Sequence, residues 1–157
     1  RELLDKPVPA DISVMVCDIR GFSGISERIG PVRTIDWISD VMNRLSRIIL
    51  HRGGTIIDYV GDEIMAMWGA PIPSQSHADE ACNCALAIQL AVDQLSEKWF
   101  PVISTNIGMG IGINSGLAVV GNTGSTHRTK YGPLGNTVNL ASRVQGATKY
   151  LQRPQRT

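Results

Sequence analysis

The chain has 157 residues, with 15 Lys or Arg against 14 Asp or Glu and a formal net charge of +1. This length is typical of one domain with a substantial buried core. The balanced charge provides neither a nucleic-acid footprint nor a polybasic membrane patch. No run approaches the roughly 20 apolar residues that span a bilayer, and residues 1–10 lack the apolar segment of a signal peptide. We therefore expect a cytoplasmic domain without direct contact to nucleic acid or membrane.

The three cysteines are Cys17, Cys82 and Cys84, and all lie in apolar runs. A zinc site would need two further ligands at suitable spacing, which the neighbouring sequence does not offer. We predict that the cysteines are small buried hydrophobic residues in a reducing compartment, with Cys82 and Cys84 on different helix faces.

The first half of the chain alternates between strand and helix patterns. Residues 12–17 form a continuous apolar run that predicts a buried strand, and residues 21–24 predict a turn. An amphipathic helix is expected next, with Pro31 near its start and Gly53–Gly54 as its stop. Its apolar face is predicted to contain Ile35, Ile38, Met42, Leu45 and Ile49. Residues 55–60 and 64–68 flank Gly61 and Asp62 and predict a hairpin, followed by a loop over residues 70–76.

The second half of the chain predicts a long helix over residues 78–99 and then a second hairpin. The helix face consists of Ala81, Ala85, Ile88, Val92 and Leu95. The hairpin is expected to pair residues 107–113 with residues 117–120 around a turn at 114–116. Residues 121–131 predict a polar excursion, and residues 137–150 a third helix. This order indicates an α+β sandwich in which helices pack on an antiparallel-rich sheet.

A glycine-rich run, Gly108-Met109-Gly110-Ile111-Gly112, lies within the strand pattern of the second hairpin. A nucleotide loop of this composition normally precedes a helix, which this run does not. We therefore interpret its glycines as positions of close backbone packing.

Two aspartates stand where a strand is expected to meet a tight turn. Asp18 ends the first apolar run, and Asp62 lies at the tip of the first hairpin. Carboxylates held in this way are ligands for Mg²⁺ or Mn²⁺, although aspartate is also common in turns for backbone reasons. The segment Gly21-Phe22-Ser23 leads from Asp18 into a helix start, where free backbone N–H groups can bind phosphate. The alternative is a plain turn with a capping serine.

Four motifs occur in order along the chain: DIRGFS, GGTIIDYVGDEIMAMWG, INSGLAVVGNTGS and GNTVNLASR. Together they resemble the class III nucleotidyl cyclase catalytic domain, the family of adenylyl and guanylyl cyclases. The resemblance extends from about residue 12 to about residue 150. It implies a ferredoxin-like palm sandwich over residues 11–151, after the end of an upstream connector (1–10) and before a tail (152–157). The family's domain continues through further strands that carry a lysine for the terminal phosphates, so we expect a C-terminally truncated piece.

The resemblance also implies roles for individual residues. Asp18, Asp62 and the backbone carbonyl of Ile19 match the family's ligands for two divalent ions, Mg²⁺ or Mn²⁺. Asn139 matches the residue that orients the ribose, and Arg143 matches the residue that stabilises charge on the α-phosphate. The family's reaction forms a 3′,5′-cyclic nucleotide and pyrophosphate from a nucleoside triphosphate. Chemistry of this kind depends on positioning and on electrostatic stabilisation.

The family places these two groups of residues on different chains. The resemblance therefore implies a head-to-tail homodimer of the bacterial type with composite active sites. Residues 122–131 resemble the family's interface arm. Gly21, Phe22 and Ser23 match its phosphate-binding segment.

The identity of the base depends on two positions, Asp58 and Gly132. Adenylyl cyclases of the family carry Lys at the first and Asp or Thr at the second, whereas guanylyl cyclases carry Glu and a small residue. A carboxylate can accept both N1–H and N2–H₂ of guanine, so the pair slightly favours GTP and cyclic GMP. Two alternatives remain: an adenylyl cyclase that forms cyclic AMP from ATP, and a catalytically silent dimerisation or nucleotide-binding module.

Overall fold

The computed structural model describes residues 6–125, 127–134, 141 and 143. The helices and strands are β1 (Val8–Ile19), α1 (Phe22–Ile29), α2 (Pro31–His51), β2 (Thr55–Val60), β3 (Glu63–Trp68), α3 (His77–Ile103), β4 (Met109–Ser125) and β5 (Arg128–Leu134). Within this part of the chain the strands form one sheet in the order β2-β3-β1-β4-β5, and all neighbouring strands are antiparallel. The predicted α+β class with an antiparallel sheet is confirmed. None of the described helices is long and apolar enough to cross a membrane.

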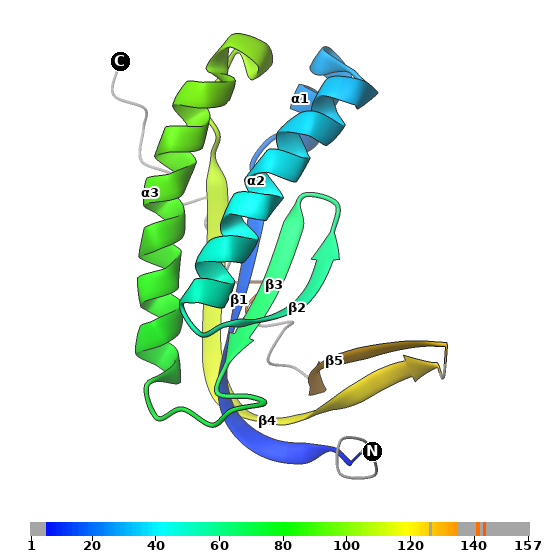
Figure 1. Cartoon of the computed structure of the whole chain (residues 1–157), viewed down its shortest axis with the longest axis vertical. Coiled ribbons are helices and arrows are strands. Elements are labelled where there is room, and N and C mark those ends of the chain that lie inside the picture. The colour runs from blue at the N-terminus through cyan, green and yellow to red at the C-terminus, as the bar shows by residue number, and fades with distance from the viewer. Residues whose placement is uncertain (1–5, 126, 135–140, 142, 144–157) are drawn as a thin grey trace.

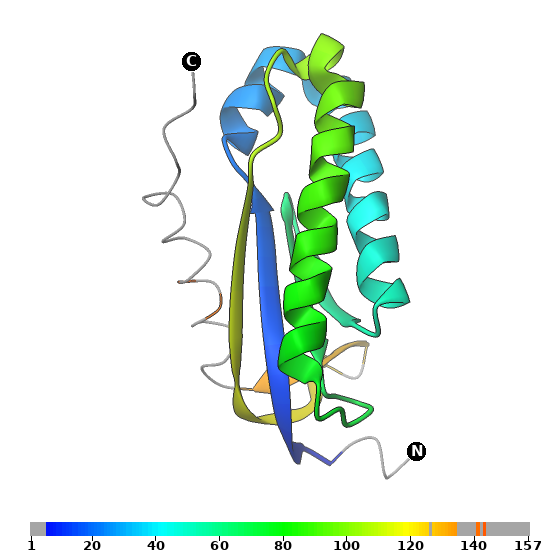
Figure 2. The same cartoon turned by 90° about the vertical axis from the view of Figure 1, so that its left-hand side faces the viewer.

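The helices α2 and α3 lie side by side on one face of the sheet, and α1 sits at the end of β1 (Figures 1 and 2). Side chains of β1 alternate between two clusters because successive residues of a strand point to opposite faces. Met15, Cys17 and Ile19 pack against the helices. Ile12, Val14 and Val16 belong to a cluster on the other face. Both faces of the central strand are therefore buried, as its continuous apolar run predicted.

The helix α2 begins at Pro31 and ends two residues before Gly53, as predicted. Its apolar face differs from the prediction at one position, because Ile35 is 65% exposed. Trp37 is fully buried instead and stacks on Phe22 of α1, with ring centroids 6.0 Å apart. The large indole therefore occupies the space between α1 and α2, and Ile35 turns outward.

The helix α3 is longer than predicted and runs from His77 through Pro101 to Ile103. Three polar contacts fix its C-terminal half. Ser96 is buried, and its Oγ accepts the N–H of Ile107 at 2.8 Å. Lys98 Nζ and Trp99 Nε1 both donate to Asp40 Oδ2 of α2, at 2.8 and 2.7 Å.

Two of the three cysteines are buried as predicted, and one is not. Cys17 and Cys84 are completely buried, whereas Cys82 is exposed. The prediction of burial for Cys82 was wrong because residues two apart on a helix lie on different faces, and only Cys84 faces the sheet. Burial raises the pKa of the Cys84 thiol to about 11 and raises that of Cys17 further.

The hairpin of β2 and β3 matches its prediction, with Gly61 at its turn in a left-handed conformation (φ +59°). The chain enters β2 through a close approach at Gly54. A Cβ added there would lie 2.7 Å from Ile49 Cγ2 and 2.8 Å from Trp68 Cζ2. Only glycine therefore fits between α2 and the start of β2 without displacing buried side chains.

The predicted turn at residues 114–116 is wrong, because β4 is one continuous strand. It pairs with β1 from Met109 to Val120, and the register places Ser115 opposite Ser13 and Gly116 opposite Ile12. The Oγ atoms of Ser13 and Ser115 are 2.5 Å apart. Pairing with a long partner strand therefore outweighs the local turn preference of Asn-Ser-Gly.

The predicted polar excursion is a second hairpin, in which the end of β4 pairs with β5. Val119 lies opposite Leu134 at one end of this ladder, and Ser125 lies opposite Arg128 at the other. The glycine-rich run at residues 108–112 lies at and within the start of β4, so its predicted place in a strand is confirmed. A Cβ at Gly108 would lie 3.1 Å from Arg20 Cβ. The third predicted helix falls outside the described residues, except that Ala141 and Arg143 are helical.

Candidate active site

The two predicted metal-binding aspartates lie at the same rim of the sheet. The ladder between β1 and β3 pairs Asp18 with Glu63, the residue that directly follows Asp62. Gly61, in a left-handed conformation, forms the turn between β2 and β3, and Asp62 follows it directly. The end of β1 that carries Asp18 and the β2–β3 turn that carries Asp62 therefore lie at the same rim of the sheet. The alternation of β1 places Asp18 on the face opposite α2 and α3.

Negative charge accumulates at this rim. Partial burial raises the pKa of Glu63 above its ordinary value, and the charges of Asp18 and Asp62 raise it further. Arg20 offsets part of this charge, since its Nη1 lies 3.6 Å from Asp18 Oδ1 and its side chain is 12% exposed. The rim therefore favours a positive ligand.

The donor set at this rim fits a hard divalent cation through two carboxylates and a backbone oxygen. Asp18 and Asp62 supply carboxylate oxygens beside Ile19, the last residue of β1. Oxygen ligands of this type are those preferred by Mg²⁺ and Mn²⁺. Among the described residues, no three His, Cys, Asp or Glu side chains gather as a metal cluster.

The predicted phosphate-binding segment is the start of a helix. Gly21 is the N-cap of α1 in a left-handed conformation (φ +66°), and its carbonyl accepts the N–H of Ile25. Among the residues that the structure describes, no side chain caps this helix end, and its first turn contains no acidic residue. The N–H groups of the first turn therefore remain available to an anion. The ring of Phe22 stacks on Trp37, so only the backbone of Phe22 is available to an anion at this helix start.

Asp58, the first predicted base-reading residue, is engaged by a lysine from a distant strand. Asp58 Oδ2 accepts Lys130 Nζ at 2.6 Å, and Oδ1 accepts the N–H of Tyr59 at 2.9 Å. The bond from Lys130 holds the pKa of Asp58 below its ordinary value. The strands β2 and β5 are the two edges of the sheet, but β4 bends so that β5 reaches β2 (Figure 1).

Gly132, the second predicted base-reading residue, faces a hydrophobic neighbour. A Cβ at Gly132 would lie 3.0 Å from Ile57 Cγ2. Ile57 lies where the β2–β3 register shifts, between Ile56 and Asp58. The structure thus brings residues 57 and 58 of β2 against residues 132 and 130 of β5.

The other predicted catalytic residues are only partly described. Asn139 falls outside the described residues, and Arg143 is helical and exposed. Ala141 is fully buried in the cluster that contains Ile12, Val14 and Val16. Ala141 therefore packs on the sheet face toward which Asp18 points.

Three charged residues at the site were not predicted from the sequence: Arg20, Glu63 and Lys130. Arg20 follows Asp18 by two residues and Glu63 follows Asp62 by one, so the motif itself could have indicated both. Lys130 is 72 residues from Asp58. Nothing local in the sequence indicates that pairing.

Comparisons with known proteins agree with this architecture. The family profile described as the adenylate and guanylate cyclase catalytic domain matches residues 5–152. Adenylate cyclase 1 of Rhizobium meliloti is 35% identical over 88% of this chain, and adenylate cyclase of Anabaena cylindrica is 33% identical over 88%. The chain spans only 21% and 27% of the lengths of these two relatives.

Solved structures of both adenylyl and guanylyl cyclases superpose on the chain. The adenylyl cyclase CyaB from P. aeruginosa has a TM-score of 0.86 at 32% identity, covering 90% of this chain and 74% of that chain. The guanylyl cyclase Cya2 has a TM-score of 0.83 at 36% identity, covering 90% and 71%. The chain belongs to the family of class III adenylate and guanylate cyclase catalytic domains.

Proposed function

We propose that this domain is a nucleotidyl cyclase that forms a 3′,5′-cyclic nucleotide and pyrophosphate from a nucleoside triphosphate. The observation that carries this proposal is the rim shared by Asp18 and Asp62, beside the uncapped start of α1. Carboxylates of the kind that bind a divalent cation, close in sequence to backbone donors of the kind that bind phosphate, support this reaction. Membership of the cyclase family supports the same reaction.

In this proposal, Asp18, Asp62 and the Ile19 carbonyl would hold two divalent ions, Mg²⁺ or Mn²⁺. When bound, such ions neutralise charge on phosphoryl oxygens and activate the attacking hydroxyl. The first-turn N–H groups around Gly21, Phe22 and Ser23 bind phosphate oxygens. Arg20 holds Asp18 in place through their ion pair.

A second copy of the chain completes the site in this proposal. Asn139 of one copy orients the ribose, and Arg143 offers a guanidinium fork to the charge that develops on the α-phosphate. The exposure of Arg143 beside the buried Ala141 supports a position from which it reaches a neighbouring chain. A symmetric homodimer then contains two composite sites.

We propose GTP as the preferred substrate, because the Asp58 carboxylate can accept both donors of the guanine edge. ATP is a second candidate for a specific reason. The Lys130 ammonium lies 2.6 Å from Asp58 Oδ2 and is a donor of the kind that the N1 acceptor of adenine needs. Relatives named as adenylate cyclases and as guanylate cyclases both match the chain.

The test is a turnover assay with GTP and ATP side by side, in Mg²⁺ and in Mn²⁺, on this chain and on a chain extended at its C-terminus. Wild-type turnover to a cyclic nucleotide, abolished by Asp18→Asn, is the expected result. Asp36→Asn is the matched control, because Asp36 is an exposed aspartate of α2 away from the rim. Silence of the extended chain with both nucleotides would overturn the proposal in favour of a non-catalytic nucleotide-binding module.

A further inference from the structure

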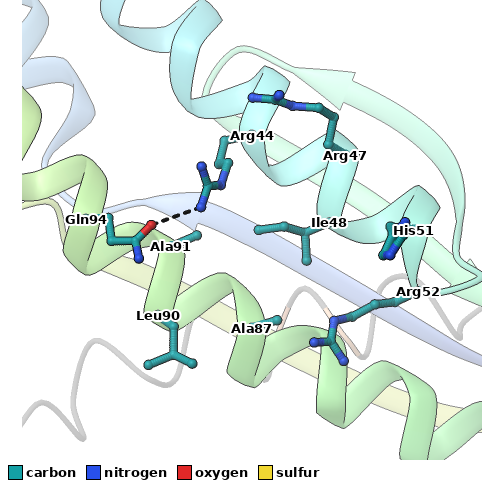
Figure 3. A pocket seen from close by; sticks show the side chains of 9 residues that line it. All are labelled: Arg44, Arg47, Ile48, His51, Arg52, Ala87, Leu90, Ala91 and Gln94. Carbon is teal, nitrogen blue, oxygen red and sulfur yellow. Dashed lines mark hydrogen bonds between the residues drawn. The ribbon is translucent and has the colours of Figure 1, made fainter.

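A groove of about 400 Å³ lies between the C-terminal half of α2 and the middle of α3 (Figure 3). The two helices run side by side on the sheet, and the groove lies between their outer surfaces. A groove of this volume lies within the range of small-molecule sites in proteins.

The walls of the groove are positively charged. Arg44, Arg47, His51 and Arg52 line it from α2 and the residue that caps its end, and no Asp or Glu is among the described residues that line it. Arg44 is held across the groove, since its Nη2 donates to Gln94 Oε1 of α3 at 2.9 Å. Arg47 and Arg52 are exposed; the Arg47 side chain points away from α3, whereas the Arg52 side chain extends toward it (Figure 3).

The floor of the groove is apolar. Ile48, Ala87 and Ala91 are at least partly buried between the helices. Leu90 also lines the groove and is 69% exposed. An occupant with a hydrocarbon body would therefore cover a leucine that now faces water.

The groove is separate from the candidate active site. Arg52 lies just before the start of β2, whereas Asp62 lies just after its end. Six strand residues span about 20 Å. The groove also opens on the helix layer, whereas Asp18 points to the opposite face of the sheet.

We propose that this groove binds a small organic anion that carries a phosphate group on an apolar body. Arginine guanidinium groups present planar pairs of donors that match phosphate oxygens, and three arginines line this groove with no acidic residue among the described lining residues. The apolar floor then accommodates the remainder of the ligand. Such a phosphate belongs either to a soluble ester or to a lipid headgroup.

The probe is phenyl phosphate, titrated into the chain in the presence of a metal chelator and followed by calorimetry and by amide NMR shifts. Saturable binding is expected, with shifts in residues 44–52 and 87–94. Inorganic phosphate and phenol, which each lack half of the proposed ligand, should bind at least tenfold more weakly. The double substitution Arg47→Gln with Arg52→Gln should raise the Kd for phenyl phosphate at least tenfold.

Arg33→Gln is the matched control, because Arg33 is an exposed arginine at the other end of α2. It should leave the Kd for phenyl phosphate within twofold. Phosphatidylcholine vesicles with and without phosphatidic acid distinguish the two sources of the phosphate. If the wild-type chain binds the vesicles with phosphatidic acid and the double substitution abolishes this binding, the phosphate is that of a lipid headgroup. If the wild-type chain does not bind these vesicles, the phosphate is that of a soluble ester. Undetectable phenyl phosphate binding, or binding that survives the double substitution, would overturn the proposal regardless of cyclase activity.

Discussion

The ion pair between Asp58 and Lys130 yields a prediction in which two substitutions change base preference in opposite directions. Asp58→Asn replaces one carboxylate oxygen by an NH₂ group of the same size. Lys130→Met removes the ammonium but keeps an unbranched side chain. Substituting Gly132 is less informative, because a Cβ there would lie 3.0 Å from Ile57 Cγ2.

The expected magnitudes follow from the contacts. If the carboxylate accepts two guanine donors, Asp58→Asn leaves one donor facing another, which costs about 1–3 kcal/mol. At 1.36 kcal/mol per tenfold, the preference for GTP over ATP falls by about 5- to 150-fold. Lys130→Met frees Asp58 Oδ2 and should raise the same preference. The pair is partly exposed, at 49% for Lys130 and 23% for Asp58, so its loss costs folding only about 0.2–1 kcal/mol.

The assay measures kcat/KM for GTP and for ATP with each variant, and a urea unfolding curve controls for stability. Asp36→Asn provides a charge-matched control on the surface of α2. Equal ratios in wild type and both variants would remove Asp58 from base recognition. An increase in the preference for GTP with Asp58→Asn would refute the reasoning outright.

Three further predictions concern stability and pH. Ser96→Ala leaves the buried N–H of Ile107 without its acceptor and should lower the free energy of unfolding, measured in urea, by about 1–3 kcal/mol. The control Ser39→Ala, on the surface of α2, should leave the free energy of unfolding unchanged within error. Gly54→Ala forces a Cβ against two buried side chains and should cost about 1–3 kcal/mol, whereas Gly116→Ala, with open space around its Cβ, should cost less than half as much. Hydrogen bonds from α3 hold the pKa of Asp40 below its ordinary value, so its contribution to stability is present above about pH 4 and is lost as pH falls through the lowered pKa. Asp40→Asn should therefore reduce the acid-induced loss of unfolding free energy, and an unchanged slope below pH 4 would contradict this.

Elements with a local signal were predictable from the sequence. The β2–β3 hairpin matches because the turn at Gly61 lies between two short apolar strands, and α2 matches because its start at Pro31 and its glycine stop are local. Local signals do not show that Asp18 and Asp62 share one rim; the pairing of Asp18 with Glu63 in the sheet shows it. Both aspartates of the rim were nevertheless identified from the sequence, because each directly follows or ends a recognisable strand.

The sequence by itself determined the α+β class, the cyclase motifs and the positions of both aspartates, because these depend on residues close together in the chain. Only the tertiary structure decided that β4 passes straight through Asn114-Ser115-Gly116, since that depends on pairing with β1 about a hundred residues earlier. It likewise decided that Asp58 meets Lys130 and that Arg44 of α2 reaches Gln94 of α3 across the groove between the two helices. Local preference differs between turn and strand by only about 1 kcal/mol, so long-range pairing and burial outweigh it.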